Sequence, residues 1–141
     1  MDRRSPAFYS ALMEGTPMAH AHGIAVVDDD QAVRDAVTNL FRSMGLPAAA
    51  FASAEEFLNS GSLGQTSCIV LDVQMPGMDG LSLQRHLVAT GRHIPIVFVT
   101  GYPDAGVREK AMSLGAVCFL TKPFNEADLV DGLRSALTDR E

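Results

Sequence analysis

Five short apolar runs alternate with longer amphipathic stretches, and this alternation constrains the fold more than any other feature of the sequence. The runs lie at residues 24–27, 48–51, 68–71, 96–99 and 116–120. Continuous apolar runs of this length are typical of strands that are buried on both faces of a parallel sheet. Parallel strands need crossover connections, which are usually helices. The pattern therefore predicts an α/β, doubly wound fold with five parallel strands and five helices.

Residues that favour helix ends mark the stretches between the runs. Ser53, with Glu56 three residues later, forms a capping-box pattern that starts the second helix. Asp30 and Asp79 stand before the first and third helical stretches, where aspartate is a favoured N-cap. Gly45 ends the first helix, because glycine is common just after a helix C-terminus. We therefore interpret Ser53, Asp30 and Asp79 as helix caps, and the two aspartates as caps rather than metal ligands.

The α/β pattern runs without interruption through residues 23–139, which predicts one domain preceded by an extension, residues 1–22. The weakly apolar segment at residues 7–9 is shorter than the core of about 7–15 residues in a signal peptide. No apolar run approaches the roughly 18 residues that indicate a membrane span. Together these features lead us to expect a cytoplasmic protein with no membrane contact.

Two further features concern charge and cysteines. The net charge is −6, and no basic stripe is present, which argues against direct nucleic-acid binding by this chain.

Cys68 and Cys118 lie in runs that we predict to be central strands separated by another strand. Their Cα atoms would then be about 10 Å apart, beyond the roughly 7 Å limit for a disulfide. We expect buried free thiols.

Polar side chains follow four of the five apolar runs. They are Asp28, Asp29 and Asp30 after the first, Asp72 after the third, Thr100 after the fourth and Lys122 after the fifth. In an open parallel sheet, ligands bind beyond the carboxyl ends of the strands. Crowded carboxylates disfavour ionisation unless positive charge offsets it, and their oxygens suit Mg²⁺. The sequence predicts a site that holds Mg²⁺ and a phosphoryl group together, with Asp72 as the nucleophile.

Four segments resemble the signatures of response-regulator receiver domains of bacterial two-component systems. They lie at residues 26–30, 71–80, 99–101 and 120–124, in the order that the family has. One segment alone would be weak evidence, but four in register are specific, and the resemblance covers about residues 23–139. It implies a flavodoxin-like sheet with strand order 2-1-3-4-5. The spacing is closest to the branch that often carries a C-terminal helix-turn-helix.

The resemblance implies a phosphoacceptor and a metal site. Asp72 matches the residue that accepts the phosphoryl group. Asp29 matches a direct ligand of Mg²⁺, and Asp28 matches a carboxylate that usually reaches the metal through water. Gln74 matches the position whose backbone carbonyl coordinates the metal. The expected metal site therefore comprises Asp28, Asp29, Asp72 and the carbonyl of Gln74.

The resemblance also implies a switch. Thr100 matches the hydroxyl that moves to bond the phosphoryl group, and Phe119 matches the aromatic residue whose rotamer follows it. Lys122 matches the ammonium that pairs with the phosphate, and its peptide bond to Pro123 is often cis in this family. The implied partners are a sensor histidine kinase or phosphotransfer protein, and a second copy bound through the face of the fourth helix, fifth strand and fifth helix.

Two other functions have the same general architecture. A Mg²⁺-dependent aspartyl phosphatase of the haloacid dehalogenase type needs a second carboxylate two residues after its nucleophile, where this chain has Gln74. A flavodoxin-like cofactor binder needs glycines and hydroxyls after the first strand, where the three aspartates would repel a phosphate. A regulatory phosphoacceptor, rather than an enzyme, fits better. The sequence leaves open whether it is a single-domain regulator or the receiver of a DNA-binding regulator.

Overall fold

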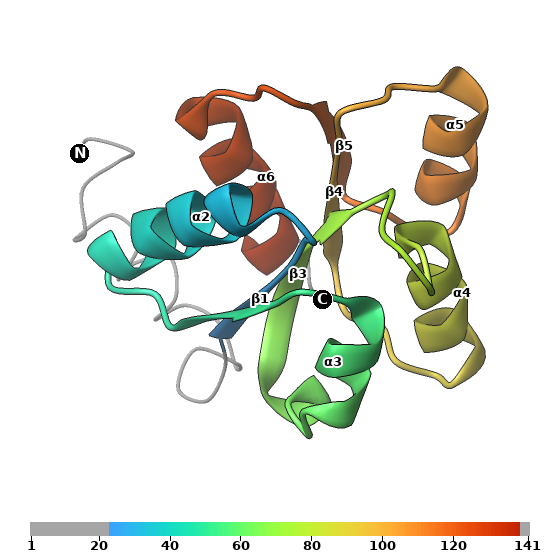
Figure 1. Cartoon of the computed structure of the whole chain (residues 1–141), viewed down its shortest axis with the longest axis horizontal. Coiled ribbons are helices and arrows are strands. Elements are labelled where there is room, and N and C mark those ends of the chain that lie inside the picture. Colours follow the sequence, from blue (N-terminus) through green and yellow to red (C-terminus); the bar gives the residue numbers. More distant parts are fainter. Residues whose placement is uncertain (1–22, 139–141) are drawn as a thin grey trace.

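A five-stranded parallel sheet forms the centre of the computed structural model, which describes residues 23–138 (Figure 1). The strands are β1 (Gly23–Val27), β2 (Ala48–Phe51), β3 (Thr66–Asp72), β4 (Ile96–Thr100) and β5 (Cys118–Thr121). Their order is β2-β1-β3-β4-β5, which confirms the predicted fold. The predicted N-terminal extension lies outside the described residues. Between residues 23 and 138, no helix is long and apolar enough to cross a membrane.

Five α-helices cover the two faces of the sheet (Figure 1). They are α2 (Gln31–Ser43), α3 (Ala54–Asn59), α4 (Gly80–Ala89), α5 (Ala105–Ser113) and α6 (Glu126–Thr138), with a short 3-10 helix, η1 (Leu63–Gln65), before β3. Helices α2 and α6 lie on one face, and α3, α4 and α5 lie on the other. Helices therefore cover both faces of the sheet, as parallel strands joined by helical crossovers require.

Each central strand contributes side chains to two separate cores, because successive residues of a strand point to opposite faces. On the α2 and α6 side, the buried strand residues include Val26, Val70 and Val97, which pack with Phe41 and Leu133. On the other side they include Val27, Leu71 and Phe98, which pack with Phe57 and Leu83. The strands are therefore apolar along their length, and polar side chains are confined to their ends.

The three predicted helix caps are confirmed. The carboxylate of Asp30 accepts the N–H of Ala32 at 2.9 Å, and that of Asp79 accepts the N–H of Ser82 at 2.8 Å. The hydroxyl of Ser53 accepts the N–H of Glu56 at 3.0 Å, and the carboxylate of Glu56 accepts the N–H of Ala52 at 2.8 Å, so the capping box forms with its return bond one residue before the N-cap. These caps fix where α2, α3 and α4 begin relative to the preceding strands.

The prediction of a central fifth strand was wrong. β5 is an edge strand, and Cys118 on it is half-buried, whereas Cys68 on β3 is fully buried. β4 separates the two, so no disulfide joins these described cysteines. The strand also begins at Cys118 rather than at residue 116, because Ala116 completes the end of α5. Its N–H bonds the carbonyl of Ala111 around Gly115, which has φ +101°, as in a Schellman motif.

Gly80 allows α4 to begin against the end of β3. Its N–H donates to the carbonyl of Val73 at 2.8 Å. A Cβ atom at this position would lie 3.0 Å from the Cα of Val73 and closer still to the carbonyl oxygen of Asp72. Backbone atoms cannot retreat as a flexible side chain can. Glycine at this position thus sets how closely α4 approaches the last residue of β3.

We expect Gly80→Ala to lower the free energy of unfolding by roughly 1–3 kcal/mol, the typical cost of overpacking. The matched control is Gly64→Ala, because a Cβ at Gly64 has nothing within 4 Å and the residue has no positive φ. Urea denaturation of both variants measures the difference, and the control should stay within about 0.5 kcal/mol of wild type. Equal stability of the two variants would contradict the close approach at Gly80.

Candidate functional site

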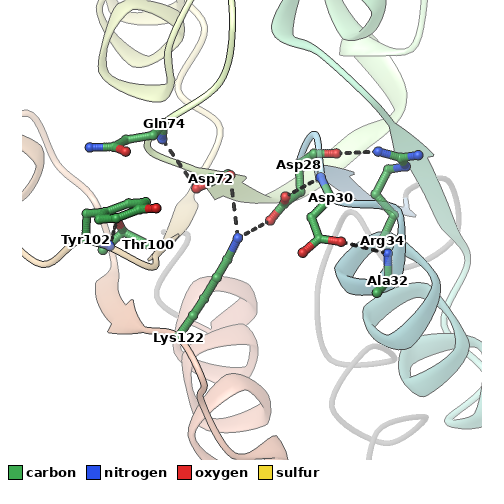
Figure 2. A network of polar contacts seen from close by, with 9 residues as sticks. All are labelled: Asp28, Asp30, Ala32, Arg34, Asp72, Gln74, Thr100, Tyr102 and Lys122. Carbon is green, nitrogen blue, oxygen red and sulfur yellow. Dashed lines mark hydrogen bonds and ion pairs between the residues drawn. The ribbon is translucent and has the colours of Figure 1, made fainter.

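The polar residues predicted at the strand ends converge at one edge of the sheet (Figure 2). Asp28 follows β1, and Asp72 is the last residue of β3; the pairing of Val27 with Leu71 places these two ends side by side. Thr100 is the last residue of β4, and it pairs with the last residue of β5, directly before Lys122. The parallel register therefore gathers four side chains that are up to 94 residues apart in sequence.

Three carboxylates form a compact cluster. Asp28, Asp29 and Asp72 each have an oxygen within 4.8 Å of the others. The side chains of Asp28 and Asp72 are buried, with relative exposures of 1% and 4%, whereas Asp29 is exposed. Clustered carboxylate oxygens are the ligands preferred by hard divalent cations such as Mg²⁺. This donor set therefore fits the metal that the sequence predicts.

Lys122 is the cation that faces the buried carboxylates. Its Nζ lies 2.8 Å from Oδ2 of Asp28 and 3.5 Å from Oδ2 of Asp72 (Figure 2). Burial by itself would lower the pKa of Lys122, but the hydrogen bond and charge of Asp28, followed by the charge of Asp72, outweigh burial and raise it. The ammonium group thus stays protonated and offsets part of the repulsion between the two carboxylates.

The same environment favours the charged form of Lys122 but the neutral form of Asp72. Burial is the main cause that raises the pKa of its carboxyl to about 7, and the charge of Asp28 adds to it. Lys122 and the N–H of Gln74, which lies 3.3 Å from Oδ1 of Asp72, oppose this shift. The carboxylate is therefore held in an electrostatically unfavourable place. A positive charge bound beside it would favour the ionised, nucleophilic form.

Sequence reasoning missed Arg34, which holds the acidic segment in place. Its Nη1 donates to the backbone carbonyl of Asp28 at 2.8 Å, while the N–H of Asp30 donates to Oδ1 of Asp28 at 2.9 Å (Figure 2). The N–H of Arg34 also bonds the carbonyl of Asp30, so it lies one turn into α2. An arginine one turn after an N-cap aspartate is the signal that would have indicated this contact.

Thr100 and Phe119 occupy different depths of the site. Thr100 is fully buried, and its Oγ1 accepts the N–H of Tyr102 at 3.0 Å. Phe119 is half-buried two residues before the end of β5, and its ring centroid lies 6.0 Å from that of Phe98. The structure thus brings Thr100 to the strand ends and places Phe119 against the core. The peptide bond between Lys122 and Pro123 is cis.

Residues 24–134 match the family model of the response regulator receiver domain. The chain belongs to this family. The receiver is 48% identical over 118 residues to nodulation protein W of Bradyrhizobium diazoefficiens. The aligned region covers 84% of this chain and 52% of that protein. It is 46% identical over 141 residues to the response regulator protein TodT of Pseudomonas putida, with 94% of this chain and 62% of that protein covered.

Solved structures give the same result. The receiver matches the response regulator StyR with a TM-score of 0.78 and 42% identity, covering 84% of this chain and 60% of that one. It matches FixJ-N with a TM-score of 0.74 and 29% identity, covering 83% of this chain and 94% of that one. The chain spans about half the length of several curated relatives that it matches.

The raised pKa of Asp72 predicts a pH-dependent stability in the metal-free receiver. Between the unfolded pKa, about 4, and the folded pKa, about 7, the folded state binds more protons, so its stability falls as pH rises through this window. We expect Asp72→Asn to be more stable than wild type at pH 8 by roughly 1–3 kcal/mol, and the gain to shrink towards pH 4.

Urea denaturation in the presence of a chelator measures this difference. Asp35→Asn is the matched control, because Asp35 is an exposed carboxylate on α2. It should leave the pH profile of wild type unchanged. An Asp72→Asn protein that is less stable than wild type at pH 8 would show that the site favours the ionised carboxylate even without metal.

Proposed function

We propose that this receiver accepts a phosphoryl group on Asp72 from a sensor histidine kinase or a phosphotransfer protein, with Mg²⁺, and then changes its partner binding. The observation that supports this most directly is the Asp72 carboxylate itself. It is buried at a strand end, beside the carboxylate of Asp28 and 3.5 Å from the ammonium of Lys122. Such a group is poised to react with an electrophile that arrives with compensating positive charge.

Transfer of the phosphoryl group from a phosphohistidine to Asp72 needs no further reactant. An oxygen of Asp72 forms a bond to phosphorus while the bond from phosphorus to the imidazole nitrogen of a phosphohistidine breaks, and that nitrogen leaves with the electron pair. Lys122 pairs with a phosphoryl oxygen, since its ammonium already lies between Asp28 and Asp72. Mg²⁺, when bound, supplies further neutralisation of phosphoryl charge. Asp28, Asp29, Asp72 and the backbone carbonyl of Gln74 are the groups proposed to hold it.

The proposed switch begins at Thr100. Its Oγ1 accepts the N–H of Tyr102, which leaves its own hydroxyl hydrogen to donate to a phosphoryl oxygen. Movement of Thr100, followed by Phe119, would change the preferred state of the face formed by α5, β5 and α6, as a shift between two populations. This face is the proposed surface for a homodimer.

Residues 23–139 are the proposed receiver unit, with a cytoplasmic location, and residues 1–22 are its extension.

The aspartyl phosphatase alternative gains no support. Gln74 stands two residues after Asp72, its side chain is exposed, and an amide cannot supply the proton that a general acid gives to a leaving group. The family match and the named relatives are all response regulators or their receivers. A phosphoacceptor that promotes only its own phosphorylation and dephosphorylation is the function we retain.

Intact-mass measurement after incubation with acetyl phosphate and Mg²⁺ tests this function. We expect wild type to gain the mass of one phosphoryl group and Asp72→Asn to gain none, because the nucleophile is then absent. Asp79→Asn is the control, because Asp79 caps α4. This variant should still gain the phosphoryl group on Asp72. Unmodified wild type, or an undiminished phosphoryl group on Asp72→Asn, would refute Asp72 as the acceptor.

A further inference from the structure

The loop between β3 and α4, residues 73–79, carries Gln74, is bonded to β4 at its first residue and is closed on that residue by Gly80. The N–H of Val73 donates to the carbonyl of Val99 at 3.0 Å, and the N–H of Gly80 donates back to the carbonyl of Val73 at 2.8 Å. The side chain of Met75 is buried in the core with an exposure of 7%. Gly77, in the outer turn of the loop, is exposed, and Met78 beside it is partly buried against the same core cluster.

Glu55 of α3 holds this outer turn. Its Oε2 accepts the N–H of Met78 at 2.9 Å, across 23 residues of sequence. Gly77 has φ +76°, and a Cβ built on it would lie 2.7 Å from the same oxygen. The carboxylate therefore lies where a side chain at position 77 would displace it, and the positive φ also favours glycine there. The hydrogen bond from Met78 is the main cause that lowers the pKa of Glu55, so the acceptor stays charged.

Two neighbouring glutamates in the first turn of α3 have different partners. Glu56 reaches back to the N–H of Ala52, one residue before the N-cap, and so stabilises the start of its own helix. Glu55 instead bonds a loop that belongs to the functional site. Because the capping box fixes the first turn, Glu55 reaches the loop from a rigid base. Helix capping does not account for the Glu55 contact.

We propose that Glu55 is a positioning residue that holds the β3–α4 loop in the conformation in which the carbonyl of Gln74 serves the divalent cation. This inference rests on the proposed function, since it concerns the same metal site. Glu55 itself is exposed and lies outside the set of proposed ligands. Its effect is on the backbone between Gln74 and Met78, so losing it weakens cation binding rather than removing a ligand.

The test compares Glu55→Ala, Glu55→Gln and Glu56→Ala in Mg²⁺ titrations followed by amide NMR shifts, which report binding without any reaction. We expect Glu55→Ala to bind Mg²⁺ roughly fivefold more weakly. This lies below the about 10- to 100-fold losses seen for direct partners of metal ligands, because the contact is solvent-exposed. Glu55→Gln should bind like wild type, since its amide oxygen still accepts the N–H of Met78.

The Met78 amide resonance of the metal-free proteins is a second readout. It should move in Glu55→Ala and stay near its wild-type position in Glu55→Gln. Glu56→Ala, which removes an equal charge from the same turn, should lose stability yet bind Mg²⁺ like wild type. Equal Mg²⁺ affinities of Glu55→Ala and wild type, or an equal loss in Glu56→Ala, would overturn the inference.

Phosphorylation by acetyl phosphate separates this inference from the function on which it rests. The rate deficit of Glu55→Ala should disappear at saturating Mg²⁺, because the nucleophile and Lys122 are intact. A wild type that binds Mg²⁺ but gains no phosphoryl group contradicts the proposed function, and the Glu55 inference is then decided by the binding titration alone. A wild type that shows no Mg²⁺-dependent shift refutes both.

Discussion

The repulsion between two buried carboxylates, Asp28 and Asp72, is the constraint on which the site depends. The pairing of β1 with β3 places their backbones side by side, so the two buried side chains share one end of the sheet. Lys122 offsets part of the repulsion, yet the pKa of Asp72 still rises to about 7, mainly through burial. The site is therefore short of positive charge, which suits it to bind a divalent cation and an electrophilic phosphoryl group.

Such a site needs a rigid frame, because carboxylates that repel each other would otherwise move apart. The apolar cores on both faces of the sheet hold the strand ends. Two helices then fix the flanking backbone from opposite sides. Arg34 of α2 bonds the carbonyl of Asp28, and Glu55 of α3 bonds the N–H of Met78 in the loop after Asp72. One charged side chain thus secures each segment that leads away from the carboxylates.

Membership of the receiver family accounts for the site but not for its output. Three relatives are named transcriptional regulatory proteins, and this chain spans only slightly more than half of their length. The strand-end side chains within residues 23–138 form the acidic site at which we propose that a phosphoryl group is received. The proposed response involves the face formed by α5, β5 and α6. Ala111 is the buried residue of α5.

The sequence by itself determined the sheet order, the helix caps and the residues at the strand ends, because these follow from local patterns and from motifs in register. Asp28, Asp72, Thr100 and Lys122 each directly follow or end an apolar run, so their convergence could be expected. Only the tertiary structure decided that Cys118 on β5 is half-buried, that Arg34 and Glu55 bond the segments at Asp28 and after Asp72, and that burial is the main cause of the raised pKa of Asp72. These depend on distances between elements remote in sequence, which no local pattern encodes.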